Sequence, residues 1–363
     1  MKRKIAVGLA WGVYVLVLLA CLEMMSQLTY RLRQGNWYFH DRAASPRGMI
    51  DLHPYFASFL VPNVDVVRNG IHITHNSFPC RGPEFARPKP PGRIRIVALG
   101  GSTTFCVGVS DNETWEHYLN EDLGAHYEVI NLGSPGGTTV ETMVQSALLF
   151  SDVQPDIAVY YFGWNDAQVQ HIKNLAPDWS DYHGQLMQSQ VFSSWRFEGH
   201  TATGYFLKQV LLRLFFHHIY LHTLAPRAQG TADALTDRID ERALSLYERN
   251  LREIAALCKA QGVRAVFVPQ VMNYDALTSD KPYGWLPFVR DRDLKKVISA
   301  YNRSLAKIAR EQNVAFAGTV LEQPWQNTDF IDCGHFSPAG NQRFARTMAD
   351  YLKGVSPPET VSK

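Results

Sequence analysis

The chemistry of this chain is predicted to centre on Ser102, a serine that follows a short apolar run and two glycines. The run from Ile94 to Leu99 has the composition of a strand buried on both faces. Gly100 and Gly101 permit the sharp turn that leaves a hydroxyl exposed at the carboxyl end of a strand, where open α/β sheets place their reactive groups. Ser102 is therefore the candidate nucleophile.

A carboxylate and a histidine that could activate such a serine occur near the other end of the chain. Asp332 stands three residues before His335 in a loop punctuated by glycine and proline. A serine hydroxyl is a weak nucleophile until an imidazole takes its proton, and the imidazole needs a carboxylate to fix its tautomer and stabilise its charge. The same pair could instead brace the loop before the last helix, so the other motifs must decide between the two interpretations.

Two further segments can supply hydrogen-bond donors to the same edge of a sheet. Residues 131–138, Asn-Leu-Gly-Ser-Pro-Gly-Gly-Thr, and residues 162–166, Phe-Gly-Trp-Asn-Asp, each follow an apolar run. The carboxyl ends of parallel strands meet at one edge, so we expect backbone N–H groups of the first segment and the amide of Asn165 to lie near Ser102. Asp166 is interpreted as a structural residue that bonds local backbone.

Together and in this order, the four segments resemble the SGNH (GDSL-type) hydrolase family over roughly residues 93–352. The resemblance implies a catalytic triad of Ser102, His335 and Asp332. It also implies a flavodoxin-like strand order for the sheet.

The same resemblance implies an oxyanion hole made by Ser102, Gly136 and Asn165, with Gly133 as the alternative to Gly136. Position 101 departs from the family's named motif, which has aspartate where this chain has glycine. Membrane-associated bacterial members often have Gly-Gly-Ser-Thr-Thr, as here. The departure therefore bears on which subfamily the chain resembles, more than on which residues are catalytic.

The elements that must position these residues alternate between strands and helices. The predicted strands are residues 94–99, 127–132, 156–162, 263–271 and 314–320. The predicted helices are residues 114–123, 139–151, 240–261 and 294–312, and a last one that follows Gly340. Near-continuous apolar strands in such an alternation predict a three-layer α/β/α fold with a parallel, five-stranded sheet.

The amino terminus indicates a membrane anchor. Three basic residues, Lys2 to Lys4, precede an uncharged apolar run from Ile5 to Leu22, which is long enough to span a bilayer. The basic residues predict a cytoplasmic amino terminus and a catalytic domain outside the cytoplasm. A cleaved signal peptide is disfavoured because no clear small-x-small site follows, and a lipoprotein anchored at Cys21 is the alternative.

The region between the anchor and the first predicted strand carries no indication of separate chemistry. Residues 64–74 predict a small hairpin that turns at Asn69-Gly70, and residues 87–92 predict an extended linker. The chain is divided accordingly into an anchor (1–25), a juxtamembrane β-rich and linker segment (26–92), a hydrolase domain (93–355) with an insertion (167–236), and a tail (356–363).

Composition and spacing argue against metal, cofactor and nucleic-acid functions. A formal net charge of +2 over 363 residues indicates no preference for nucleic acid. The five cysteines include no Cys-x-x-Cys pair, although a disulfide among Cys80, Cys106 and Cys333 stays open. His218 and His222, next to His217, have a metal-ligand spacing, but no nearby carboxylate or cysteine completes a site. No metal or cofactor is expected.

The insertion, residues 167–236, allows two interpretations. It could form a lid or an acyl-binding wall, or it could form ordinary helices that cap the edge of the sheet, and we favour the helices. The activity expected of the whole chain is that of an extracytoplasmic, membrane-anchored serine esterase acting on a small ester, a lipid or an acetylated envelope glycan. The alternative is an O-acyltransferase that uses the same triad, and a non-catalytic binding module is disfavoured because every expected position is filled.

Overall fold

Five parallel strands form the centre of the structure, a computed structural model. Their order across the sheet is β6, β5, β7, β8, β9, which confirms the flavodoxin-like order. The bounds of the strands are β5 Ile94–Gly100, β6 Tyr127–Asn131, β7 Ile157–Tyr161, β8 Arg264–Val268 and β9 Ala315–Phe316. The structure describes residues 2–44, 48–51, 53, 56, 59–171, 175–179, 201–223, 238–277 and 289–355.

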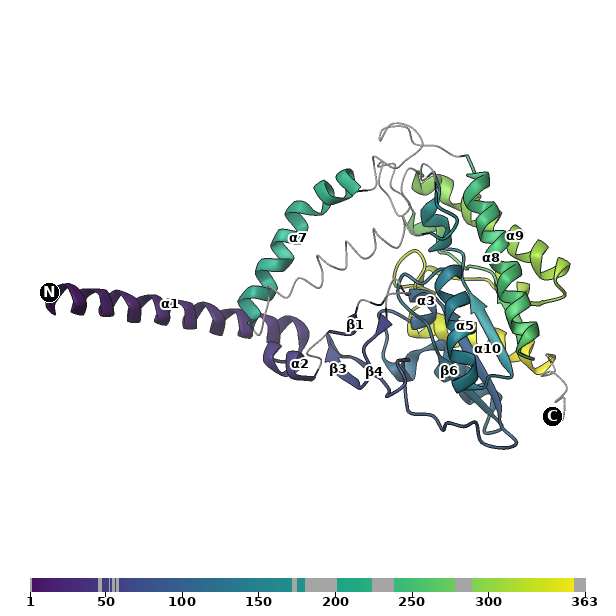
Figure 1. The fold of residues 1–363 in the computed structure, drawn as a ribbon, viewed down its shortest axis with the longest axis horizontal. Coiled ribbons are helices and arrows are strands. Elements are labelled where there is room, and N and C mark those ends of the chain that lie inside the picture. The colour runs from purple at the N-terminus through teal and green to yellow at the C-terminus, as the bar shows by residue number, and fades with distance from the viewer. Residues whose placement is uncertain are drawn as a thin grey trace.

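Helices cover both faces of this sheet, as the predicted three-layer fold requires (Figure 1). Ile96 and Ala98 of β5 pack with the helices on one face, and Val97 and Leu99 pack with those on the other. The first face carries α4 (Trp115–Leu123) and α10 (Pro338–Lys353); the second carries α5 (Thr139–Val153), α8 (Glu241–Ala260) and α9 (Leu294–Glu311). The alternation of β5 side chains between two apolar layers explains its near-continuous apolar sequence.

The last helix does not follow Gly340, so that expectation is wrong. Helix α10 begins at Pro338, with the Ser337 hydroxyl accepting the Gly340 N–H at 3.3 Å as an N-cap. Gly340 lies in the first turn, where a Cβ would come within 1.9 Å of the Asp329 carbonyl oxygen. The glycine therefore allows the helix to pack closely on the preceding loop, and it does not mark where that loop ends.

Helix α1 (Lys2–Gln34) carries the apolar run of the amino terminus. It is long and apolar enough to cross a bilayer, as an anchor or as a signal sequence, and its most apolar window makes no buried contact. At 1.5 Å per residue the helix is about 50 Å long, whereas the hydrocarbon core of a bilayer is about 30 Å thick. Residues 26–34, which the sequence assigned to a β-rich segment, are helical instead.

The carboxyl-terminal part of α1 packs against α7 (Ala202–Thr223), a helix of the insertion (Figure 1). The Glu23 carboxylate accepts the backbone N–H groups of Ala202 at 2.8 Å and Thr203 at 3.0 Å. Tyr30 of α1 contacts the Tyr205 ring edge-on at 5.2 Å between centroids. Helix α7 agrees with the helices expected for the insertion, and its first turn packs on α1; most of the insertion, and with it the expected cap of the sheet edge, lies outside the described residues.

The juxtamembrane segment contains the predicted hairpin. Strands β3 (Val64–Arg68) and β4 (Ile71–His75) pair antiparallel, and both turn residues, Asn69 and Gly70, have positive φ, as a two-residue hairpin turn requires. Residues 38–44 form helix α2, and β1 (Ile50–Asp51) pairs with β2 (Phe59–Leu60). Single β-bridges connect His75 to Arg81 and Arg81 to Asn131, so this segment extends the edge of the sheet at β6.

None of the five cysteines, all of which the structure describes, forms a disulfide. Cys106 instead approaches a buried carboxyl group, because its Sγ lies 3.4 Å from Glu116 Oε2 on α4. Glu116 is 3% exposed, and burial raises its pKa to about 8 although Cys106 and Arg81 act in the opposite direction. The carboxyl group is therefore protonated in the folded protein at neutral pH.

The raised pKa of Glu116 predicts a pH-dependent cost in stability. Between about pH 4.5 and about pH 8 the folded protein holds a proton on Glu116 that the unfolded chain has released, so its stability falls as pH rises through this range and levels off above it. Glu116→Gln should therefore raise the melting temperature at about pH 8.5 more than at about pH 5.

The measurement is thermal unfolding of the detergent-solubilised full chain at both pH values. One pKa unit corresponds to about 1.4 kcal/mol, so the gain at the higher pH should be easily measured. Asp122→Asn, an exposed change on the same helix, is the control and should give the same small effect at both pH values. An equal effect of Glu116→Gln at the two pH values would contradict the assigned protonation.

Candidate active site

Ser102 is the first residue of a one-turn helix, α3 (Ser102–Phe105), that follows β5 directly. The preceding turn is packed too closely for side chains. A Cβ on Gly100 would lie 2.2 Å from both Thr104 Oγ1 and the Tyr161 carbonyl oxygen, and a Cβ on Gly101 would lie 2.2 Å from Asn165 Nδ2. The two glycines therefore let the end of β5 approach its neighbours, which places Ser102 at the carboxyl edge of the sheet.

Ser102, His335 and Asp332 form one chain of hydrogen bonds, although the serine and the histidine are 233 residues apart. His335 Nε2 lies 2.8 Å from Ser102 Oγ, and His335 Nδ1 lies 2.7 Å from Asp332 Oδ2. An ionised Asp332 can only accept, so Nδ1 carries the ring proton and Nε2 is free to accept the serine hydroxyl. The structure thus brings the three predicted residues together in the order that serine chemistry requires.

The Asp332 carboxylate is fixed by its own loop. Its Oδ1 accepts the backbone N–H groups of Gly334 and His335, each at 2.8 Å. Partial burial acts to raise the pKa of Asp332, but the hydrogen bonds from the His335 ring and from these N–H groups outweigh it and hold the pKa below its ordinary value. Asp332 is therefore ionised at neutral pH and can balance a positive charge on His335.

Asn165 points its amide at the turn that precedes Ser102. Asn165 Nδ2 donates to the Gly137 carbonyl oxygen at 2.8 Å, and Gln168 Nε2 donates to Asn165 Oδ1 at 3.3 Å. These partners set which end of the amide is nitrogen, and they leave the second Nδ2 hydrogen for another acceptor. The side chain is 7% exposed, so its orientation is held from several sides.

The glycines after β6 differ in what their N–H groups do. The Gly133 N–H donates to Asn131 Oδ1 at 2.8 Å, and the Gly137 N–H donates to the Ser134 carbonyl at 2.8 Å. Within the part of the chain that the structure describes, the Gly136 N–H has no hydrogen-bond acceptor. This difference favours Gly136 over Gly133 as a donor to a ligand.

Asp166 does not bond local backbone, contrary to our interpretation. Its Oδ1 accepts the backbone N–H of Thr139 at 3.0 Å and the Thr139 hydroxyl at 2.6 Å, 27 residues away at the start of α5. Oδ2 is buried without a partner among the described residues, and burial raises the pKa of Asp166 to about 7 despite the bonds from Thr139. The side chain thus connects the segment that carries Asn165 to the helix that follows Gly136.

Asn131 connects two segments of the site, a role that its place at the start of a motif does not reveal. Asn131 Nδ2 donates to the Thr104 carbonyl of α3 at 2.8 Å while Oδ1 accepts the Gly133 N–H. One side chain therefore connects the serine segment to the glycine segment. An asparagine at the end of a strand was the only sequence signal for this role.

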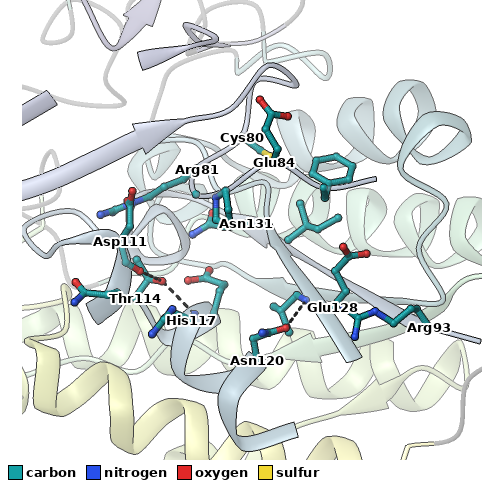
Figure 2. Close-up of a pocket in the computed structure, with 17 residues that line it drawn as sticks. Cys80, Arg81, Glu84, Arg93, Asp111, Thr114, His117, Asn120, Glu128 and Asn131 are labelled. Carbon is teal, nitrogen blue, oxygen red and sulfur yellow. Dashed lines mark hydrogen bonds and ion pairs between the residues drawn. The ribbon is translucent and has the colours of Figure 1, made fainter. Parts of the chain in front are cut away.

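A cavity of about 390 Å³ lies between α4, β6 and the segment 80–85, and Asn131 is one of its lining residues (Figure 2). Ser102, Asp332 and His335 are not among its lining residues. Among the described residues no cluster of three histidine, cysteine or acidic side chains could hold a metal ion. The side chains of His217, His218 and His222 lie outside the described residues, as does most of the insertion and the tail 356–363.

Comparison with solved structures finds distant likenesses. The crystal structure of TesA is 16% identical, with a TM-score of 0.41, and the match covers 71% of this chain and 98% of that one. A lipase/acylhydrolase from Enterococcus faecalis is 15% identical (TM-score 0.41; 73% and 98% covered). A catalytic mutant of Axe2, an acetylxylan esterase from Geobacillus stearothermophilus, is 16% identical (TM-score 0.40; 71% and 94% covered). Such remote likenesses do not distinguish one substrate from another.

Comparison with curated proteins gives no match. The family comparison is decisive, because the model of the GDSL-like Lipase/Acylhydrolase family matches residues 98–343. This range includes the serine turn, both donor segments and the Asp-x-x-His loop. The chain therefore belongs to the GDSL-like lipase/acylhydrolase family and is an ester-bond hydrolase.

Proposed function

We propose that the chain hydrolyses carboxylic esters with Ser102 as nucleophile, His335 as general base and acid, and Asp332 as the residue that orients the imidazole. The observation that carries this proposal is the continuous hydrogen-bond chain from Ser102 Oγ through the His335 ring to Asp332. All three side chains sit in one strand-edge site, and His335 remains 21% exposed, so an ester can reach it.

The reaction proceeds in two halves. Ser102 Oγ attacks the ester carbonyl while His335 Nε2 takes the hydroxyl proton, and the tetrahedral intermediate collapses as His335 returns that proton to the departing alcohol. The acyl group is then bonded to Ser102. A water molecule, deprotonated by His335, attacks this acyl-enzyme, and the carboxylic acid leaves as the serine regains its proton.

The negative charge that develops on the carbonyl oxygen needs donors that are already in place. We propose the backbone N–H groups of Ser102 and Gly136 together with Asn165 Nδ2. The absence of an acceptor for Gly136 N–H in the described residues and the second, uncommitted hydrogen of Asn165 Nδ2 support this set. Fixed donors stabilise the transition state without reorganisation during the reaction.

We also propose that α1 is an uncleaved anchor that holds the hydrolase domain at the outer face of a membrane. The basic residues Lys2 to Lys4 in front of the apolar run support a cytoplasmic amino terminus. The alternative of a lipid attached to Cys21 predicts a mature chain that lacks residues 1–20, which intact-mass measurement distinguishes. In either arrangement the substrates in reach include lipids and acetylated envelope glycans.

The experiment that tests the activity uses the full chain in detergent micelles with p-nitrophenyl acetate and p-nitrophenyl butyrate. Ser102→Ala should abolish turnover because the acyl-enzyme cannot form. A parallel reaction with a glycan acceptor measures how the acyl group divides between water and sugar hydroxyls. Release of acetate to water supports the esterase, and transfer that dominates in the presence of glycan would replace it by the O-acyltransferase. Turnover that survives in Ser102→Ala would reject the nucleophile.

Asn165→Ala should lower kcat by about a hundredfold or more, because one oxyanion donor is worth about 3 to 4 kcal/mol of barrier. The folded state is expected to persist, since the change removes an amide at the rim of the sheet. Steady-state kinetics beside a melting curve separates the two effects. A well-folded variant with near-normal kcat would remove Asn165 from the oxyanion hole.

Gly101→Ala should impair the same step while residue 165 stays an asparagine. The new Cβ would lie 2.2 Å from Asn165 Nδ2, so the amide must move away from its position beside Ser102. Gly334→Ala is a matched control in the other active-site loop, because its Cβ would meet only Met272, at an ordinary 3.5 Å. We expect a fall in kcat of about tenfold or more for Gly101→Ala and little change for Gly334→Ala. Equal kcat values for the two variants would contradict this geometry.

A further inference from the structure

Arg81 lies in the juxtamembrane segment, outside the predicted hydrolase domain, yet it contacts the turn that carries Ser102. Its side chain is 1% exposed and extends beside Asp111 (Figure 2). We infer that Arg81 is a positioning residue for the nucleophile, because its guanidinium holds the backbone of α3 and of the loop after it in place. This inference rests on the proposed function of Ser102.

The guanidinium binds three backbone carbonyl groups at once. Nη1 donates to Phe105 O at 2.5 Å and to Cys106 O at 2.7 Å, and Nη2 donates to Val109 O at 2.6 Å. Nε donates to Asp111 Oδ1 at 2.8 Å. The guanidinium carbon also lies 4.9 Å from the centre of the Phe105 ring, within range of a cation–π interaction.

The nucleophile segment cannot hold this shape alone. Helix α3 is a single turn, and a single turn gains too few hydrogen bonds to offset the entropy of forming it. The residue that caps its carboxyl end is Cys106, a residue other than glycine in the left-handed region, with φ of 58°. Arg81 bonds the carbonyl oxygen of this residue, and a positive charge at the carboxyl end of a helix interacts favourably with its dipole.

Arg81 is itself fixed from two sides. Its backbone N–H donates to the Asn131 carbonyl at the end of β6 at 3.2 Å. Asp111, its carboxylate partner, uses Oδ2 to accept the backbone N–H of Thr74 at 2.7 Å and the Thr74 hydroxyl at 2.6 Å. The hairpin β3–β4 and the strand β6 therefore brace the guanidinium, which in turn braces the backbone that begins at Ser102.

A general loss of stability is the competing explanation for any defect in an Arg81 variant, and Arg95 provides the matched control. Arg95 is equally buried, donates to the carbonyl groups of Val153 and Ala86 and to the carboxylate of Glu128, and lies 5.2 Å from the Phe85 ring. It lies at the opposite end of β5, and none of these side-chain partners lies between residues 100 and 111. Truncating either arginine leaves buried polar groups unpaired, so both variants should be destabilised.

The experiment compares Arg81→Ala, Arg81→Lys and Arg95→Ala in the full chain in detergent. The rate of labelling by a fluorophosphonate probe, normalised to the folded fraction, reports how reactive Ser102 is, independently of ester binding. We expect Arg81→Ala to lower this rate and kcat by about tenfold or more with little change in KM, because small displacements of a nucleophile are costly. Arg95→Ala should label at a rate within about twofold of the wild-type protein once the folded fraction is counted.

Arg81→Lys keeps the charge but cannot bond three carbonyls and a carboxylate together, so it should label at an intermediate rate. If Arg81→Ala does not fold, the labelling rate of Arg81→Lys alone tests the positioning role. Added guanidinium ion should partly restore the rate of Arg81→Ala, since the cavity of about 390 Å³ is lined by both Arg81 and Asp111 and gives the ion a route to the vacated position. It should not accelerate Arg95→Ala.

Wild-type labelling rates in Arg81→Lys, or equal losses in Arg81→Ala and Arg95→Ala, would overturn the positioning role while leaving the proposed nucleophile intact. Labelling of the wild-type protein that persists unchanged in Ser102→Ala would instead reject the nucleophile, and with it this inference. The two failures are therefore distinguishable in one set of measurements.

Discussion

The close approach of backbone at the end of β5 is the constraint on which the site depends. A Cβ at Gly100 would overlap Thr104 and the Tyr161 carbonyl, and a Cβ at Gly101 would displace the Asn165 amide. This packing brings the segment after β7 against the serine turn. Without this packing, Asn165 could not lie beside Ser102, and the two side chains could not act on the same ligand.

The polar residues around this turn are connected to one another more than to solvent. Asn131 joins α3 to the glycine segment, and Asp166 joins the segment of Asn165 to the start of α5. Thr139 continues the second connection, since its hydroxyl accepts Asn250 Nδ2 of α8 at 2.9 Å. Buried hydrogen-bond networks favour one arrangement of the backbone, and here they fix the loops that surround the nucleophile, although Asp166 Oδ2 has no partner among the described residues.

The parallel five-stranded sheet and the candidate residues Ser102, Asp332 and His335 could be predicted because each depends on a local pattern: apolar runs, paired glycines and an Asp-x-x-His spacing. The strand order was implied only by the family resemblance. The partners of Asp166 and Arg81 could not be predicted. Both side chains contact backbone more than twenty residues away, and a lone buried acid or arginine has the same local sequence as an exposed one. The extent of α1 was missed for a related reason, since its last turns are mostly polar and Ser26 and Tyr30 in them contact α7.

The contact between Glu23 and α7 bears on how a soluble form of this protein can be produced. A helix begins with N–H groups that have no acceptor inside the helix, and for α7 the acceptor is a carboxylate supplied by α1. A fragment cut after residue 25, the end of the predicted anchor segment, would lose that carboxylate while keeping the helix that needs it. The boundary for expression therefore belongs between Leu22 and Glu23, where it removes the apolar run and keeps the carboxylate.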